Sequence, residues 1–164
     1  MIKLVRLDER LIHGQVAIKW SRHTNVDRII VANDAAASSK IIADSLLTAA
    51  PATAKTAIKS VDDTIKMLKN PKAADHKILL IVQTPEDLLK LLSDCPAPET
   101  VNIGNYGRVA KKRGEEERKT YGSNLYLYPD EAETLKKVCA LGYNTVYQTT
   151  PENTPENLAK LLEK

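Results

Sequence analysis

Two short and nearly unbroken apolar segments constrain the fold of this chain more than any other feature of its sequence. Residues 28–33 read RIIVAN and residues 77–83 read KILLIVQ, so neither segment alternates between apolar and polar positions. Such a run is typical of a parallel strand that is covered by helices on both faces. The second segment is the most hydrophobic in the chain, and we expect it to lie at the centre of a sheet.

Strand-like and helix-like segments alternate along the whole chain. The expected strands cover residues 2–7, 28–33, 54–58, 77–83, 100–104, 125–128 and 143–147. Six helices are expected among them, beginning near residues 14, 39, 60, 84, 129 and 154. Ser60 and Thr84 have the form of helix N-caps, whereas Pro51 and Gly142 mark helix ends. This order predicts a three-layer α/β fold with a mainly parallel seven-stranded sheet and about six helices on both faces.

Length and composition are those of an ordinary globular domain. The 164 residues contain no repeat or linker, so we expect a single domain over residues 1–164. The chain contains no run of about 18 apolar residues, so no membrane span is predicted. Residues 1–8 become charged too early for a signal peptide. We therefore expect a cytoplasmic protein. Cys95 and Cys139 match no metal or redox spacing and are interpreted as buried or incidental thiols.

The basic residues of the chain do not predict a nucleic-acid-binding face. The net charge is +3, and the densest basic group, residues 108–113, is followed at once by the acidic residues 115–117. Such mixed charge is typical of a solvated loop or helix face. Nucleic-acid binding favours a basic face with interleaved aromatic residues, but aromatic residues make up only 4% of this chain and phenylalanine is absent.

The stretch of residues 6–16, RLDERLIHGQV, is the candidate functional site. It places one histidine, two arginines and two carboxylates between a strand end and a helix start. A helix N-terminus offers free N–H groups, arginine binds phosphate oxygens bidentately, and neutral imidazole is a nucleophile near pH 7. Asn33, Asp34 and Gly104 also follow strand ends, so we expect them at the same edge of the sheet as this stretch.

His13 has three possible roles on the residues alone. It is a structural histidine that closes a loop, a metal ligand, or a nucleophile that accepts a phosphoryl group. Neither His23 nor His76 has a metal-ligand spacing with it, so no metal site is predicted. No glycine-rich nucleotide loop is present either, because the segment GNYG at residues 104–107 does not match those spacings. A phosphate-accepting His13 therefore requires no cofactor if the donor is another phosphoprotein.

The sequence resembles a known family. Residues 6–16, followed by Lys19 and Trp20, resemble the N-terminal signature of the mannose/fructose/sorbose-family IIB component of the bacterial sugar phosphotransferase system. The resemblance continues through residues 29–34, 78–82 and 101–104 and spans essentially the whole chain. It implies a mainly parallel seven-stranded sheet and the activity of a protein-N(pi)-phosphohistidine–sugar phosphotransferase.

The resemblance also implies roles for individual residues. His13 would be the phosphohistidine intermediate, and Arg10 would stabilise the phosphate from the same loop. The phosphoryl group would come from a phosphohistidine on a IIA protein or domain. It would pass to a sugar, a hexose or N-acetylated amino sugar, bound by the membrane components IIC and IID. The chain would thus associate peripherally with the transporter, without nucleic acid and without inserting into the membrane.

Several further site residues are expected around this pair. Asp8 either orients His13 or Arg10, or forms a salt bridge that structures the loop. The backbone N–H groups of Gly14 and Gln15 would face the phosphate. Four residues are expected at the rim of the site, namely Arg6, Asn33, Asp34 and Gly104. After Gly104 the sequence departs from the family pattern. A non-catalytic regulatory or scaffold protein that docks the same partners remains the alternative function.

Overall fold

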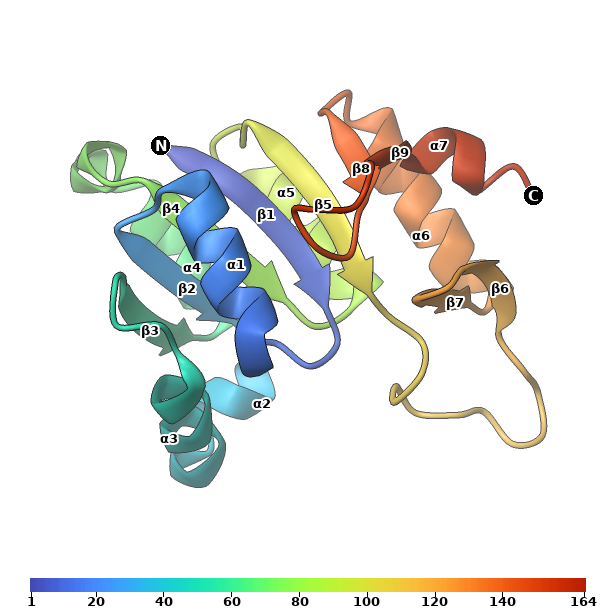
Figure 1. The fold of residues 1–164 in the computed structure, drawn as a ribbon, viewed down its shortest axis with the longest axis horizontal. Coiled ribbons are helices and arrows are strands. Elements are labelled where there is room, and N and C mark those ends of the chain that lie inside the picture. The colour runs from blue at the N-terminus through green and yellow to red at the C-terminus, as the bar shows by residue number, and fades with distance from the viewer.

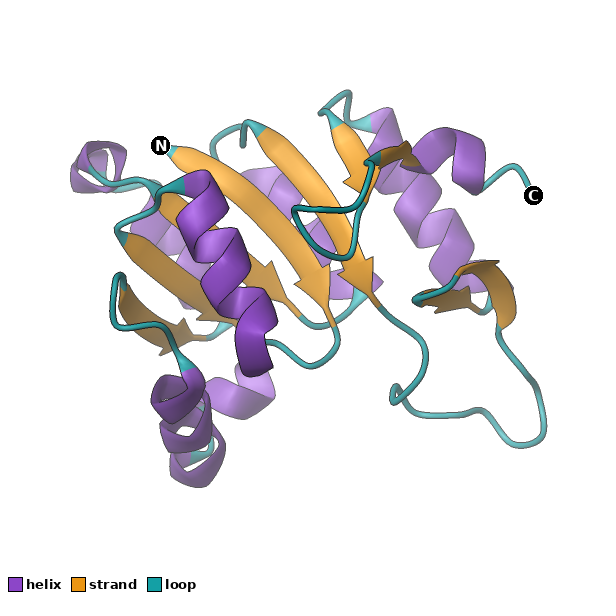
Figure 2. Cartoon of the chain, viewed as in Figure 1, coloured by secondary structure: helices purple, strands orange, loops and turns teal.

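The computed structural model describes all 164 residues and contains one large sheet between two layers of helices (Figures 1 and 2). The strand order in this sheet is β3 (Lys55–Lys59), β2 (Arg28–Ala32), β4 (Ile78–Val82), β1 (Ile2–Asp8), β5 (Thr100–Asn105), β8 (Thr145–Tyr147) and β9 (Glu156–Asn157). All neighbouring strands are parallel except β8 and β9, which are antiparallel. The expected α/β fold with a mainly parallel seven-stranded sheet is therefore confirmed.

Helices cover both faces of the sheet, as Figure 1 shows. The helices are α1 (Gly14–Thr24), α2 (Asp34–Ala37), α3 (Lys40–Ala49), α4 (Val61–Leu68), α5 (Pro85–Asp94), α6 (Pro129–Ala140) and α7 (Leu158–Leu161), with a 3₁₀ turn over Pro71–Asp75. Helix α1 lies on one face, and α4, α5 and α6 lie on the other. None of these helices has the length and apolar character needed to cross a membrane.

The strand β4 explains how an unbroken apolar segment serves two cores. Leu79 and Ile81 belong to a cluster of 12 buried residues on the α1 face. Ile78, Leu80 and Val82 belong to a cluster of 27 buried residues on the other face. Because successive side chains of a strand point to opposite faces, every position of β4 is apolar. The expected central place of this strand is confirmed.

Local capping interactions begin three helices where the sequence predicts. The hydroxyl of Ser60 accepts a hydrogen bond from the backbone N–H of Asp63 at 3.1 Å, and that of Thr84 accepts from Asp87 at 3.1 Å. Ser39 caps α3 in the same way. Each cap satisfies one of the free N–H groups in the first turn of its helix.

Two features of the C-terminal third differ from the sequence-based expectation. Strand β7 (Leu125–Leu127) was expected in the main sheet, but it pairs antiparallel with β6 (Lys119–Gly122) in a separate two-stranded sheet. The seventh strand of the main sheet is β9, where the start of the last helix was expected. That helix begins only after Asn157, whose side chain accepts from the N–H of Lys160. Both differences arise from strand pairing, which the local sequence does not specify.

Helix α1 ends at Thr24, within the polar residues 21–25 where its end was expected. Ser21 is buried on the face of α1 that packs on the sheet, and Asn25 adopts the left-handed conformation that ends the helix. The short helix α2 was not predicted; the side chain of Asn33 caps it by accepting from the N–H of Ala36.

Candidate functional site at the carboxyl ends of the central strands

The loop between β1 and α1 is fixed to the core by its own apolar residues. Leu11 and Ile12 are buried in the cluster on the α1 face. Leu11 has a left-handed backbone with φ of 58°, and its N–H donates to the carbonyl of Asp8 at 2.9 Å. This tight turn anchors the middle of the loop and leaves Arg10 exposed on one side of it and His13 partly exposed on the other. The loop therefore presents Arg10 and His13 on a rigid base.

His13 is half-exposed and is held by a buried carboxylate. Its Nε2 lies 3.0 Å from Oδ2 of Asp8; the histidine side chain is 27% exposed, whereas that of Asp8 is only 1% exposed. Because an ionised carboxylate only accepts hydrogen bonds, we assign the proton of the neutral ring to Nε2. In that tautomer Nδ1 carries a free lone pair, which the ring needs in order to act as a nucleophile.

Asp8 is itself held in place by two further hydrogen bonds. Its Oδ1 accepts from the backbone N–H of Arg10 at 3.0 Å, and its Oδ2 forms an ion pair with the guanidinium of Arg6 at 3.1 Å. The sequence left two alternatives open for Asp8, orientation of His13 or a structural salt bridge. The structure brings both contacts together on one carboxylate.

The Arg6 guanidinium lies inside the protein instead of at the rim of the site. It donates to the backbone carbonyls of Gln148 at 3.2 Å and Thr149 at 3.0 Å and to the side-chain carbonyl of Asn102. Burial lowers the pKa of Arg6, and the charge of Asp8 opposes that shift. Arg6 therefore supports the site from beneath as the counter-ion of Asp8.

Gly104 and Trp20 shape the space that Arg6 occupies. A Cβ atom at Gly104 would lie 2.2 Å from the guanidinium carbon of Arg6, so only glycine fits beside it. On the other side, the guanidinium carbon lies 5.2 Å from the centre of the Trp20 ring, within the range of a cation–π contact. Gly104, which was expected at the rim of the site, thus acts by making room for Arg6.

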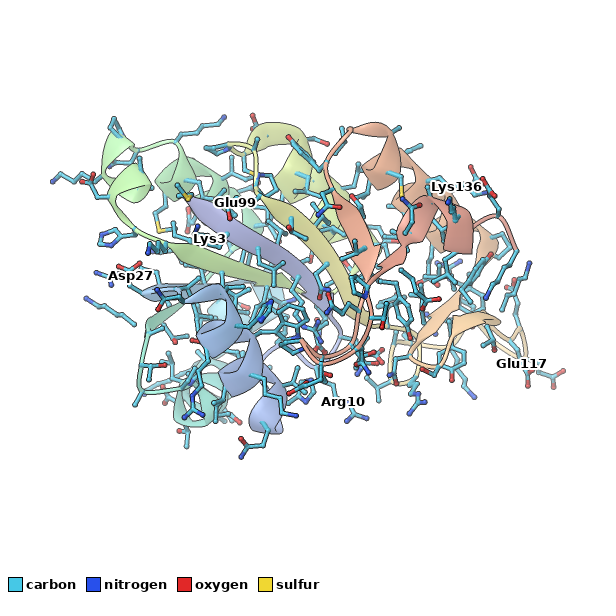
Figure 3. The ribbon with its side chains drawn as sticks, turned by 45° about the horizontal axis from the view of Figure 1, so that its top comes forward. Lys3, Arg10, Asp27, Glu99, Glu117 and Lys136 are labelled. Carbon is cyan, nitrogen blue, oxygen red and sulfur yellow. The ribbon has the colours of Figure 1, made fainter.

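The outer surface of the site is electropositive. Arg10 is exposed and makes no ion pair, and it lies at the edge where the strands end (Figure 3). His13 is the N-cap of α1 but its side chain caps no N–H, and the first turn of α1 contains no acidic residue. Gly14 and Gln15 are exposed in that turn. Their N–H groups and the helix dipole favour an anion beside His13.

The two remaining candidates at strand ends have different positions. The side-chain amide of Asn33 donates to Gln83 at 3.0 Å, and Gln83 in turn donates to the backbone carbonyl of Glu9 at 3.0 Å. Asn33 is thereby connected to the loop that carries His13. Asp34 accepts instead from the N–H of Val61 at 2.9 Å, at the start of α4. Its carboxylate therefore supports a neighbouring helix.

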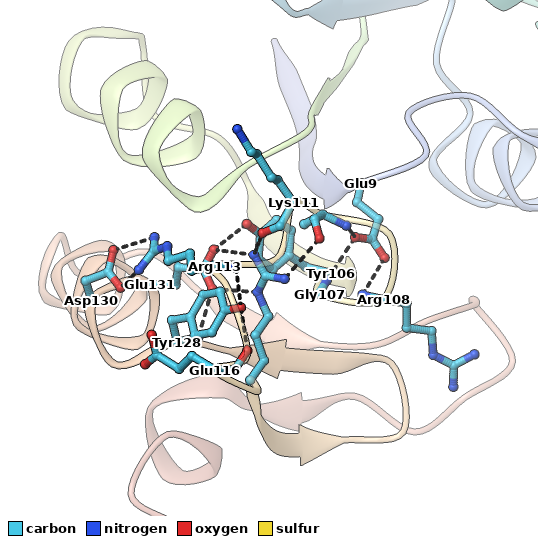
Figure 4. Close-up of polar contacts among 12 residues, drawn as sticks. Glu9, Tyr106, Gly107, Arg108, Lys111, Arg113, Glu116, Tyr128, Asp130 and Glu131 are labelled. Atoms are coloured by element: carbon cyan, nitrogen blue, oxygen red, sulfur yellow. Dashed lines mark hydrogen bonds and ion pairs between the residues drawn. The ribbon is translucent and has the colours of Figure 1, made fainter.

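A cavity lies beside this loop, on the side away from α1. It has a volume of about 820 Å³ and is bordered by the loop after β5 and by the start of α5. At its wall Glu131 accepts from the hydroxyl of Tyr106 at 2.5 Å and from Nε of Arg118 at 2.9 Å (Figure 4). Burial raises the pKa of Glu131, but the hydrogen bonds from Arg118, Tyr106 and the backbone N–H of Tyr128, together with the charge of Arg118, leave the pKa below its ordinary value.

Sequence reasoning did not identify Glu9, Asn102 or the carbonyl groups of Gln148 and Thr149 as parts of this region. Glu9 is buried, and both of its carboxylate oxygens bind backbone N–H groups of the loop after β5. Its position between Asp8 and Arg10 was the only available signal. The carbonyl groups carry no sequence signal, because every residue has one.

The fold and this loop define an α/β protein with a half-exposed histidine and an unpaired arginine at the carboxyl edge of a parallel sheet. A sequence model described as the sorbose subfamily IIB component of the phosphotransferase system (PTS) matches residues 2–164. The chain belongs to this family of IIB components.

Individual relatives agree with this assignment. A probable phosphotransferase enzyme IIB component of Streptococcus pyogenes serotype M6 is 37% identical over 163 residues, which is 99% of each chain. The mannose-specific EIIAB component of Escherichia coli K12 is 34% identical over 165 residues, and the match covers 49% of that protein. The crystal structure of the IIB domain of the sorbose permease from Klebsiella pneumoniae has a TM-score of 0.88 at 26% identity. It covers 99% of this chain, which in turn covers 96% of that domain.

Proposed function

We propose that this protein is a cytoplasmic phosphocarrier in sugar uptake, and that His13 is the residue that carries the phosphoryl group. The donor is a phosphohistidine on a IIA partner, and the acceptor is a hexose or N-acetylated amino sugar bound by membrane components IIC and IID. The observation that carries the proposal is the contact of His13 Nε2 with the buried Asp8, 3.0 Å away. It orients the ring and leaves Nδ1 as the free nucleophile.

In the first step, Nδ1 of neutral His13 attacks the phosphorus atom of the donor phosphohistidine. The phosphorus–nitrogen bond of the donor breaks as the new bond to Nδ1 forms, and the donor ring leaves with the electron pair. The His13 ring then carries both the phosphoryl group and the Nε2 proton, so it is cationic. Oδ2 of Asp8 lies 3.0 Å from Nε2, the atom that carries this proton, and stabilises the positive charge.

The transferring group is stabilised by charge and position. A phosphoryl transition state spreads negative charge over its three equatorial oxygens, so catalysis depends on electrostatics and alignment. The unpaired guanidinium of Arg10 and the N–H groups of Gly14 and Gln15 supply positive charge at the same edge. In this proposal they bind the equatorial oxygens.

In the second step, a sugar hydroxyl attacks the phosphorus atom on His13. The bond to Nδ1 breaks, and the ring leaves as neutral imidazole with its proton still on Nε2. The hydroxyl proton passes to a base on the acceptor side. Because two successive partners must reach the same atom, a half-exposed histidine on a surface loop suits the task better than a buried one.

The test is labelling with a ³²P-phosphorylated IIA protein. We expect acid-labile, base-stable label on the wild-type protein and none on His13→Ala, whereas the matched variant His23→Ala takes up label normally. Unchanged labelling of His13→Ala would refute the role of His13. Binding of the donor without label on any histidine would instead favour the non-catalytic docking protein.

A further inference from the structure

Glu9 binds a row of four consecutive backbone N–H groups. Its Oε1 accepts from the N–H of Gly107 at 3.0 Å, of Val109 at 3.2 Å and of Ala110 at 3.1 Å, and its Oε2 accepts from that of Arg108 at 3.1 Å. Glu9 is only 3% exposed, and no arginine or lysine side chain pairs with it. The loop after β5 therefore closes around one carboxylate, as Figure 4 shows.

The backbone converges on Glu9 because Gly107 has a conformation that favours glycine. Its φ is 102°, and a Cβ atom there would lie 2.0 Å from the carbonyl oxygen of Tyr126. Successive N–H groups that turn toward one point form an anion-binding concavity. In this protein the concavity is occupied by a side chain of the β1–α1 loop. Glu9 thus connects two loops that are about 100 residues apart in the sequence.

The far part of the same loop is also fixed. The guanidinium of Arg118 donates to the carbonyls of Ala110 at 3.1 Å and Lys111 at 2.9 Å. The hydroxyl of Tyr128 accepts from the N–H of Arg113 at 2.9 Å. The segment between Gly107 and Arg113 is therefore held at both ends.

This fixed segment exposes side chains that have no partner within the protein. Val109 is 61% exposed, and Lys111 and Lys112 are exposed without an ion pair. Arg113, in contrast, is paired with Asp130. An exposed apolar side chain flanked by unpaired cations is suited to a partner with an acidic face. Val109, Lys111 and Lys112 border the same cavity as Glu9, and Glu9 is followed in the chain by Arg10 of the proposed phosphate site.

We propose that Glu9 is a positioning residue that holds the 107–113 segment against the His13 loop. Val109, Lys111 and Lys112 on that segment then form a docking surface for the acidic face of the phosphoryl donor protein. The inference rests on the proposed function. The donor is the better fit than a membrane component, because a diffusing phosphoprotein brings negative charge that exposed lysines steer into place.

Docking of the donor and the chemical step at His13 can be measured separately. If Glu9 acts by placing a docking surface, its loss weakens the encounter with a protein donor and leaves the reactivity of His13 unchanged. Phosphoramidate is a small phosphoryl donor that needs no docking surface. The ratio of the labelling rate with the protein donor to that with phosphoramidate therefore distinguishes a positioning role from damage to His13 itself.

The experiment compares Glu9→Ala and Glu9→Gln with the control Glu115→Gln, an exposed glutamate of the same loop. In Glu9→Gln the remaining oxygen retains up to three acceptor contacts, so we expect a smaller effect than in Glu9→Ala. For Glu9→Ala we expect KM for the phosphorylated IIA donor to rise about tenfold. We expect kcat and the rate of phosphoramidate labelling to stay within about twofold of wild type, and the control to match wild type.

A second variant covers the case in which Glu9→Ala does not fold. The double variant Lys111→Ala/Lys112→Ala removes two exposed side chains, and we expect it to raise KM and to weaken the salt dependence of association. An unchanged KM in both variants, or a parallel loss of phosphoramidate labelling in Glu9→Ala, would overturn the proposal. If the wild type accepts phosphate from neither donor, the proposed function fails, and this inference fails with it.

Discussion

Replacing Asp8 by asparagine removes one negative charge from the point where the ring of His13 and the guanidinium of Arg6 meet. The carboxylate is only 1% exposed and lies 3.0 Å from Nε2 of His13 and 3.1 Å from Arg6. Asparagine has almost the same shape, so the packing is retained. One of its two polar atoms is an amide nitrogen that only donates hydrogen bonds, and with that nitrogen in the place of Oδ2 the ring tautomer with the proton on Nδ1 is favoured. The nucleophilic lone pair is then on the wrong nitrogen.

The size of the effect follows from the bonds that change. A hydrogen bond to a charged group is worth about 1.5–3 kcal/mol. Loss of the bond between the Asp8 carboxylate and the cationic His13 ring therefore slows transfer by about 10- to 160-fold. The change of tautomer adds to this loss. In a serine-protease triad the corresponding exchange lowers turnover about 10⁴-fold. We expect Asp8→Asn to fall between these limits.

The assay is the rate of labelling by a phosphorylated IIA protein, with ³¹P NMR to identify the phosphorylated nitrogen. Asp44→Asn, an exposed substitution in α3, is the matched control. The variant should remain folded, because Arg6 keeps its carbonyl partners. Labelling of Asp8→Asn on Nδ1 at the wild-type rate would refute the role assigned to this carboxylate.

Three further predictions follow from the site and its surroundings. We expect Arg10→Ala to slow phosphoryl transfer about 10- to 100-fold, since it removes the charge-assisted bonds proposed to bind phosphate, and to change the unfolding free energy by less than about 0.5 kcal/mol. Gly104→Ala lowers the unfolding free energy by about 1–3 kcal/mol, measured by urea titration, because a Cβ atom there overlaps Arg6. Glu131→Gln reduces the acid sensitivity of folding. The pKa of Glu131 lies below its ordinary 4.5 in the folded state, with Arg118 as an ion-pair partner, so its carboxylate contributes stability above pH 4.5 that is lost as pH falls through the folded pKa.

Each of these predictions has a result that contradicts it. Transfer by Arg10→Ala at the wild-type rate would remove this guanidinium from the phosphate site. A wild-type denaturation midpoint for Gly104→Ala would show that Arg6 moves aside without cost. For Glu131→Gln, the stability difference from wild type should shrink as the pH falls from about 5 through the ordinary pKa of 4.5 and into the acid range. A constant difference over that range would mean that the carboxylate charge is not what stabilises this cluster.

The parts of the fold that depend on local chemistry were predictable from the sequence. Strand β4 was identified because both of its faces are apolar, and the helix starts after Ser60 and Thr84 followed from their capping side chains. The arrangement of β7 and β9 was not predictable. Their place depends on which distant backbone they pair with, and two or three residues carry too little pattern to specify a partner.

The candidate site was predictable in outline but not in its supporting contacts. Arg10 and His13 were placed together because they lie in one short loop after a strand. Arg6 was expected at the rim, since an arginine is rarely fully buried, yet distant carbonyl groups and Gly104 enclose it. The anchoring role of Glu9 was hidden for the same reason, because backbone N–H groups almost 100 residues away satisfy it.

The carbonyl groups that hold Arg6 have a consequence for the order of events during synthesis. They belong to Gln148 and Thr149, which are separated from Arg6 by 142 and 143 positions along the chain. A growing chain releases the His13 loop from the ribosome long before these residues are made. Until they have folded against β1, Arg6 lacks two of its acceptors and the carboxylate behind His13 lacks a fixed counter-ion. A nascent chain therefore displays the His13 loop early but completes the support of the proposed phosphate acceptor only after β8 and the residues that follow it are in place.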